Sequence, residues 1–209
     1  LTAYTPFANA GERVEPYLIE KIVDRDGNVV HQHQTESTDV MTPENAYVMT
    51  DMLQGVVQEG TGKKAKELER PAAGKTGTTN ELKDAWFVGY TPDVLAGVWV
   101  GYDDHNVSLG KGETGGHAAC PIWVSFMKEW LKDAPVEAFP IPPGVVFAKI
   151  NPNSGGLAGS RDPSAISVAF AGEVPKLQAR PRSTERFNES GSESGRPATS
   201  ESFFKSDLF

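Results

Sequence analysis

The chain has 209 residues, of which 38% are hydrophobic, so it can bury one sizeable core or one core with an appendage. Its net charge is −8; residues 176–209 hold six Lys or Arg against five Asp or Glu, a net +1, so residues 1–175 carry −9. This acidic body excludes nucleic acid as an expected partner, because neutralising phosphates supplies most of that affinity. No apolar run approaches the roughly 18 residues of a membrane span, and we expect Leu1 to be neither a native start nor the start of a signal peptide.

The first 40 residues are expected to form the end of a helix and then a β-hairpin. Residues 1–10 place apolar side chains on one helical face, and Gly11 is positioned to end the helix. Residues 14–23 then alternate apolar and polar, as a strand does. Asp26-Gly27 predicts a two-residue turn, and residues 29–33 would return as the second strand.

A second helix is predicted to begin at Thr42-Pro43-Glu44, which supplies a cap, a proline in the first turn and an acid near the positive end of the dipole. It should end near residues 60–62 and lead into a charged surface loop over residues 63–70. The expected apolar face of this helix consists of Tyr47, Val48, Met52, Leu53, Val56 and Val57.

Three short strands follow, over residues 73–78, 85–90 and 95–102, and their short separators predict antiparallel neighbours. A glycine-rich loop over residues 110–116 then leads into a helix over 118–132. The apolar stripe of that helix, which we expect to cover the sheet, consists of Ile122, Trp123, Phe126, Met127 and Trp130.

Composition divides the chain into three regions. Residues 1–134 carry the regular pattern described above, whereas residues 135–175 are punctuated by prolines and predict a small irregular extension. Residues 176–209 are rich in Ser, Glu, Arg and Pro, and too poor in apolar residues to offset the entropy of ordering, so they predict a disordered tail.

The informative motif is Lys75-Thr76-Gly77-Thr78. Its letters also end the phosphate-binding loop G-x-x-x-x-G-K-[ST], but the required first glycine is Glu69, and Pro71 falls inside that loop. A carboxylate facing phosphates is repulsive, and the segment that follows resembles a strand, not a helix. These observations disfavour a nucleotide site.

The alternative for this motif is a strand at the edge of an active-site cleft. Lys75 would supply positive charge, the Thr76 and Thr78 hydroxyls would bind a carboxylate, and Gly77 would allow close approach of a ligand to the backbone. A backbone N–H at the strand end would then serve as an oxyanion donor. An ordinary edge strand with a solvated lysine remains the other possibility, although a glycine in mid-strand argues against it.

The K-T-G triplet belongs to the signature of penicillin-binding proteins and β-lactamases, and its surroundings are more specific. Residues 73–80, 84–92 and 97–103, with Gly60-Thr61-Gly62 and with Gly115-Gly116 ahead of Pro121-Ile122-Trp123, closely resemble the transpeptidase domain of class A (bifunctional) penicillin-binding proteins. The resemblance covers residues 1–131 and continues more weakly to 175. It implies an α+β fold with an antiparallel sheet covered by helices, here the C-terminal part of an incomplete penicillin-binding/serine β-lactamase-like transpeptidase domain.

By this resemblance, the family cross-links peptidoglycan through a serine that attacks the D-Ala-D-Ala stem peptide, and β-lactam antibiotics acylate the same serine. Carried over, Lys75 and Thr78 would be catalytic, with the Thr78 N–H forming half of the oxyanion hole. Thr76, Gly77, Thr78, Thr79 and Asn80 would bind substrate, whereas Asp84, Trp86 and Phe87 look structural. No metal or cofactor is implied. The partners would be the stem peptide, β-lactams and the N-terminal half of the same domain, at the periplasmic face of the bacterial inner membrane.

The family also places S-x-x-K and S-x-N ahead of K-T-G, and the chain contains no S-x-N. S-x-x-K occurs at Ser108/Lys111, Ser125/Lys128 and Ser202/Lys205, all after the motif that should follow it. Ser125 and Lys128 share a helix face as a nucleophile and its base would, but a helix surface pair is favoured by their order and context. We therefore expect the isolated chain to lack the acylation step.

The remaining candidates favour structural roles. His31 and His33 would face the same way on a strand, yet no third metal ligand is nearby, so a solvated face is expected. His105 and His117 are interpreted as a loop and a helix-start residue, and Asp103-Asp104 as a turn. The lone Cys120 cannot form an internal disulfide and is expected to be a small buried residue.

Three other functions stay open. A binding module of the same fold would recognise peptides without acylation, a scaffold fragment would act through its tail, and a serine β-lactamase relative would hydrolyse β-lactams. In the leading hypothesis, a truncated transpeptidase, several core faces should be exposed because the helical half of the domain is absent.

Overall fold

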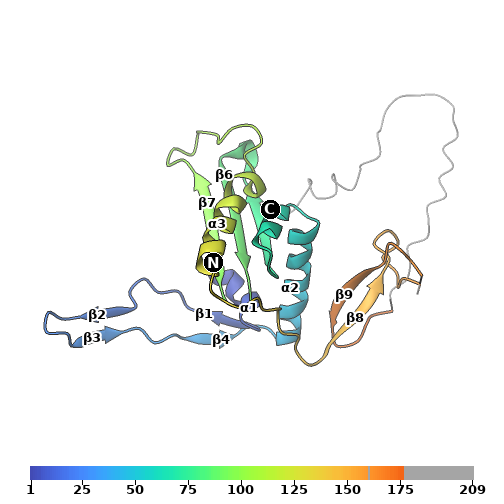
Figure 1. The fold of residues 1–209 in the computed structure, drawn as a ribbon, viewed down its shortest axis with the longest axis horizontal. Helices are drawn as coiled ribbons and strands as arrows, with labels where there is room; N and C mark the ends of the chain where they lie inside the picture. Colours follow the sequence, from blue (N-terminus) through green and yellow to red (C-terminus); the bar gives the residue numbers. More distant parts are fainter. Residues whose placement is uncertain (160, 177–209) are drawn as a thin grey trace. The chain divides into compact units, whose positions relative to one another are not determined.

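The computed structural model describes residues 1–159 and 161–176, which form an α+β arrangement around a three-stranded antiparallel sheet (Figure 1). This arrangement agrees with the α+β fold class expected from the sequence. The helices and strands are a 3₁₀ turn (Thr2–Tyr4), α1 (Thr5–Ala8), β1 (Glu12–Val14), β2 (Lys21–Val23), β3 (Val29–Gln32), β4 (Ser37–Asp39), α2 (Pro43–Gln58), a 3₁₀ helix (Lys63–Leu68), β5 (Ala73–Thr78), a 3₁₀ turn (Asn80–Leu82), β6 (Asp84–Tyr90), β7 (Leu95–Gly101), a π-helical turn (Gly115–Ala119), α3 (Cys120–Trp130), β8 (Val145–Ile150) and β9 (Ile166–Ala171).

The predicted hairpin is a two-stranded ribbon in which β1 pairs with β4 and, further out, β2 pairs with β3 (Figure 1). Its turn lies where Asp26-Gly27 predicted it, but the loop has five residues. The Asp24 N–H donates to Asn28 O (2.9 Å), the Gly27 N–H donates to Asp24 O (3.1 Å), and Gly27 adopts φ +88°. The Asp24 carboxylate also accepts bonds from Asp26 and Asn28, which lower its pKa and favour the longer loop.

Helix α2 begins where the sequence predicted. The Thr42 hydroxyl accepts a hydrogen bond from the Asn45 N–H (3.3 Å), with Pro43 at the first helical position. The buried face differs in part from the expected one: Met52 is exposed, whereas Thr50 is buried and its hydroxyl lies 2.8 Å from that of Tyr90. Burial raises the pKa of Tyr90 to about 12, so this pair stays neutral. The full set of buried α2 residues is Ala46, Thr50, Leu53 and Val57.

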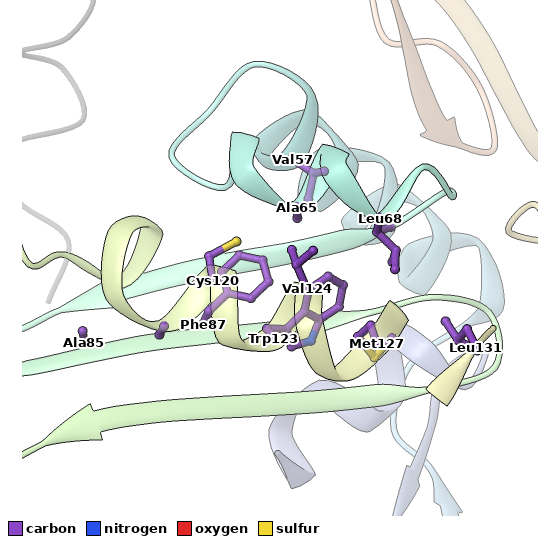
Figure 2. Packing of buried hydrophobic residues seen from close by; sticks show 12 residues of the cluster. Val57, Ala65, Leu68, Ala85, Phe87, Cys120, Trp123, Val124, Met127 and Leu131 are labelled. Atoms are coloured by element: carbon purple, nitrogen blue, oxygen red, sulfur yellow. The ribbon is translucent and has the colours of Figure 1, made fainter. Parts of the chain in front are cut away.

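The central sheet has the order β5-β6-β7, with every neighbour antiparallel, as predicted. One face packs against α3, where Phe87 of β6 meets Trp123 of α3 in an edge-to-face contact with ring centroids 5.1 Å apart. Figure 2 shows Val57, Ala65 and Leu68 approaching this cluster from α2 and the adjoining 3₁₀ helix. The segment expected to be a surface loop is therefore a 3₁₀ helix that contributes to the core, because Ala65 and Leu68 are apolar and three residues apart.

Helix α3 has two apolar stripes, only one of which covers the sheet. Trp123 and Met127 are buried as expected, together with Cys120, Val124 and Leu131. Three residues expected in the same stripe lie instead on an adjacent, exposed face of the helix: Ile122, Phe126 and Trp130. Trp130 keeps 65% of its surface exposed. On this exposed stripe Phe126 stacks on Trp130, with ring centroids 5.9 Å apart.

Residues 135–175 are more regular than their proline content suggested. Strands β8 and β9 pair without a break over six residues each, and this hairpin contacts α2. The Ala169 N–H donates to the Asp51 carboxylate of α2 (3.0 Å), and the Phe147 ring meets Tyr47 edge-on at 6.1 Å. The tail expected over residues 176–209 lies outside the described residues except for Lys176.

No helix within residues 1–159 and 161–176 combines the length and apolar character needed to cross a bilayer.

Candidate active-site strand

The K-T-G-T motif occupies β5, which is the edge strand of the sheet and is hydrogen-bonded to β6. The Thr79 N–H donates to Asp84 O (3.0 Å), immediately beyond the pairing of Thr78 with Ala85. Because bonded and non-bonded pairs alternate in antiparallel sheets, Gly77 and Lys75 also bond β6, whereas the N–H and C=O groups of Thr76 and Thr78 face away from it. The Thr78 N–H, which was expected to be an oxyanion donor, therefore points away from β6 toward the edge of the sheet.

The two threonine hydroxyls of β5 are each held by a different partner. Thr78 Oγ1 accepts a hydrogen bond from the Gly115 N–H (3.0 Å), so its own proton is free to point elsewhere. Thr76 Oγ1 lies 2.6 Å from Thr61 Oγ1, a hydroxyl that follows helix α2. Both threonines lie on the same face of the strand because they are two residues apart.

Gly115 and Gly116 pack so closely against neighbouring backbone atoms that a side chain at either position would clash with them. A Cβ on Gly115 would lie 2.2 Å from Trp86 O and 2.5 Å from Gly77 O, both backbone atoms. A Cβ on Gly116 would lie 2.5 Å from Thr61 O. The π-helical turn before α3 therefore packs directly against the backbone of β5 and β6.

Lys75 is exposed and points to the opposite face of the sheet from Thr76 and Thr78. Its Nζ donates to Thr76 O (3.0 Å), an oxygen that faces the free edge. The ammonium group therefore lies beside the edge that would hold a ligand, and it adds positive charge there.

Thr79 and Asn80, expected at the rim of the cleft, begin the turn between β5 and β6. Thr79 Oγ1 donates to the Asp84 carboxylate (3.2 Å) and accepts from the Asp84 N–H (2.8 Å), so this hydroxyl closes the turn. Asn80 is exposed. Trp99 Nε1 donates to the same carboxylate (2.9 Å), which fits the structural role inferred for Asp84. Phe87 is buried, whereas Trp86 keeps 46% of its surface exposed.

Two of the three alternative S-x-x-K serines lie within the described residues. Ser108 Oγ donates to Glu81 O (2.7 Å) and so holds the turn after β5. Ser125 and Lys128 lie on the exposed side of α3, and no hydrogen bond joins them among the described residues. Ser202 and Lys205 lie outside the described residues.

The other candidates are placed in structural positions. His33 stacks on the Tyr17 ring with centroids 3.9 Å apart, and no group of three His, Cys, Asp or Glu in the described part of the chain could hold a metal ion. Cys120 is buried as expected, and burial raises the pKa of its thiol to about 11. His117 lies in the π-helical turn, and Asp104 Oδ1 accepts from the Asn106 N–H (2.9 Å) within a turn.

Three residues that shape this region received no individual role from sequence reasoning: Thr61, Gly115 and Arg70. The first two lie in glycine-containing motifs that the family resemblance flagged, but their contacts with β5 span 15 and 37 residues. Arg70 lies in the segment expected to be a surface loop. Its guanidinium donates to the carbonyls of Leu131 (2.6 Å), Ala134 (2.7 Å) and Pro135 (2.7 Å), which follow α3.

Comparison with known proteins decides the family of this strand and its surroundings. Residues 1–128, more than half of the chain, match the family model described as the penicillin binding protein transpeptidase domain. The chain belongs to the penicillin-binding protein transpeptidase family. Lys75-Thr76-Gly77 lies inside the matched residues, and the next regular segment after its 3₁₀ turn is a strand and not a helix, which argues against a phosphate-binding loop.

The relatives of this transpeptidase-family chain confirm the resemblance to class A members. Penicillin-binding protein 1A of Aquifex aeolicus is 42% identical over 175 residues, covering 84% of this chain and 24% of that protein. Penicillin-binding protein 1A of Pseudomonas aeruginosa is 35% identical over 222 residues, covering 82% of this chain and 27% of the relative. The crystal structure of penicillin-binding protein 1A from Haemophilus influenzae superposes with a TM-score of 0.76 at 26% identity, over 86% of this chain and 32% of that one.

The chain thus spans about a quarter of the length of the curated relatives it matches.

Proposed function

We propose that this chain is the C-terminal, substrate-holding part of a serine D,D-transpeptidase that cross-links peptidoglycan and is acylated by β-lactams. The observation that carries the proposal is the edge of β5. There the Thr78 N–H points away from β6, the Lys75 ammonium lies beside Thr76 O, and the Thr76 and Thr78 hydroxyls lie on one face of the same strand.

In this reaction a serine oxygen bonds to the carbonyl carbon of the penultimate D-Ala, and the bond to the terminal D-Ala nitrogen breaks. The amine leaves with a proton. An amine of a neighbouring strand then bonds to the same carbonyl carbon, the bond to the serine oxygen breaks, and the serine regains a proton. The Thr78 N–H would stabilise the oxyanion that forms on the carbonyl oxygen each time a nucleophile adds to the carbonyl carbon. Removing one such donor typically slows a reaction by about 10²- to 10³-fold.

The threonine hydroxyls would bind the terminal carboxylate of the stem peptide, or the carboxylate of a β-lactam. Hydroxyl donors suit this task because a carboxylate accepts short, charge-assisted hydrogen bonds. Lys75 would orient the hydroxyl of the S-x-N motif and add positive charge for the anionic substrate.

The serine of S-x-x-K and the S-x-N motif would come from a part of the domain outside this sequence, so we expect the isolated chain to be inactive. We also propose, from the same resemblance, that the domain of the whole protein works at the periplasmic face of the inner membrane. Its partners would be the stem peptide and β-lactams.

The test is labelling with a fluorescent penicillin, applied to this chain and to a longer version that includes the residues encoded before Leu1. We expect the longer protein to be labelled and the short chain to remain unlabelled. Lys75→Ala in the longer protein should weaken labelling, because it removes the positive charge beside the edge of β5.

Ser125→Ala in the longer protein is the matched control and should leave labelling unchanged. Labelling of the short chain that disappears with Ser125→Ala would show that the α3 serine is the nucleophile and would overturn the proposed division of roles. A longer protein that binds the stem peptide reversibly but is never labelled would instead be a peptide-binding module.

A further inference from the structure

We propose that Thr61 is a positioning residue for this reaction: its hydroxyl directs the Thr76 hydroxyl toward the substrate carboxylate. The proposal rests on the proposed function, because it assigns to Thr76 the role of a carboxylate donor. It extends the site beyond β5 to the segment that follows α2.

The first support is the contact itself. The two hydroxyl oxygens are 2.6 Å apart, within the range of an O–H···O hydrogen bond, and Thr61 is exposed. Thr61 belongs to no strand of the sheet, so its side chain reaches the motif from a separate element.

The second support is the rigidity of Thr61. The N–H groups of Gly60 and Gly62, on either side of it, both donate to Val56 O at 3.0 and 3.1 Å. Its own carbonyl packs on Gly116, where a Cβ would lie only 2.5 Å from Thr61 O. The hydroxyl of Thr61 is therefore presented from a backbone that is fixed on both sides.

The third support is the number of protons. A threonine hydroxyl has one proton, so Thr76 can donate to a carboxylate only if the Thr61 hydroxyl donates to Thr76. The resulting chain runs from Thr61 to Thr76 to the carboxylate, and each bond polarises the next. The Thr78 hydroxyl is oriented independently, because it accepts from the Gly115 N–H. That backbone donor stays in place when Thr61 is substituted.

The experiment measures the second-order rate constant of acylation of the longer protein by a penicillin with a free carboxylate and by its methyl ester. Thr61→Val keeps the shape of the side chain and removes the donor. We expect it to slow acylation by the free acid by about 3- to 10-fold, which corresponds to one hydrogen bond, and to change the reaction with the ester by less than about 2-fold. Thr61→Ser should restore the rate with the free acid.

A second comparison tests the coupling directly. If Thr61 acts through Thr76, then Thr61→Val should cause little further loss in a protein that already carries Thr76→Val. Thermal unfolding of each variant serves to exclude a general loss of stability.

Equal slowing with acid and ester, or additive losses in the double variant, would overturn the positioning role and leave Thr61 as a structural residue. An unchanged rate in Thr61→Val with a normally acylated parent would also overturn it. A parent that is not acylated by either compound would instead refute the proposed function, so the two failures are distinct.

Discussion

At the scale of single residues, Gly115 is confined to glycine by backbone atoms that cannot move aside. We expect Gly115→Ala to destabilise the fold by about 1–3 kcal/mol, because the added Cβ would lie 2.2 Å from Trp86 O and force β5 and α3 apart. Chemical denaturation followed by tryptophan fluorescence measures the change.

The control is the same substitution in mid-helix at Gly55, where a Cβ would meet nothing within 4 Å. Gly55→Ala should stabilise the protein by about 0.5–1 kcal/mol, because alanine loses less backbone entropy than glycine in a helix. Equal effects of the two substitutions would show that Gly115 has no special packing role.

At the scale of elements, Arg70 lies between the 3₁₀ helix and β5, and its side chain hydrogen-bonds the segment that follows α3. We expect Arg70→Lys to cost about 1–3 kcal/mol of unfolding free energy, because a lysine cannot reach three carbonyls from one planar fork. Urea unfolding measures this change in unfolding free energy. The comparison is Arg13→Lys, an exposed arginine paired with Glu15, which should change stability by less than about 0.5 kcal/mol.

The elements near the motif were predictable because their signals are local. The cap at Thr42, the alternation of β5 to β7 and their short connections all lie within a few residues of the structure they specify. The prediction of which α3 residues cover the sheet was correct for only part of the set. Periodicity identifies the apolar residues of a helix but does not show which of two adjacent apolar faces packs on the sheet. The bonds from Thr61 and Gly115 to β5 join distant segments, and no local pattern specifies them.

At the scale of the molecule, the β8–β9 hairpin is attached to α2 through Asp51. We expect Asp51→Ala to free the hairpin, so that amide hydrogen exchange accelerates in β8 and β9 while β5 to β7 keep their protection. Asp51→Asn retains an acceptor oxygen and should preserve most of the protection. Uniform acceleration throughout the chain would instead mean that the hairpin and the sheet unfold as one unit.

The unpaired edge of β5 has a consequence for the protein in concentrated solution. No other strand in the described part of the chain pairs with this edge, so it could pair with the same strand of another molecule, and such edges seed aggregation. Natural proteins discourage this with a charged side chain on the edge, and Lys75 is an exposed cation in the middle of β5. Two copies that paired there would bring two Lys75 side chains together, so the residue proposed to attract the anionic substrate would also disfavour pairing between molecules.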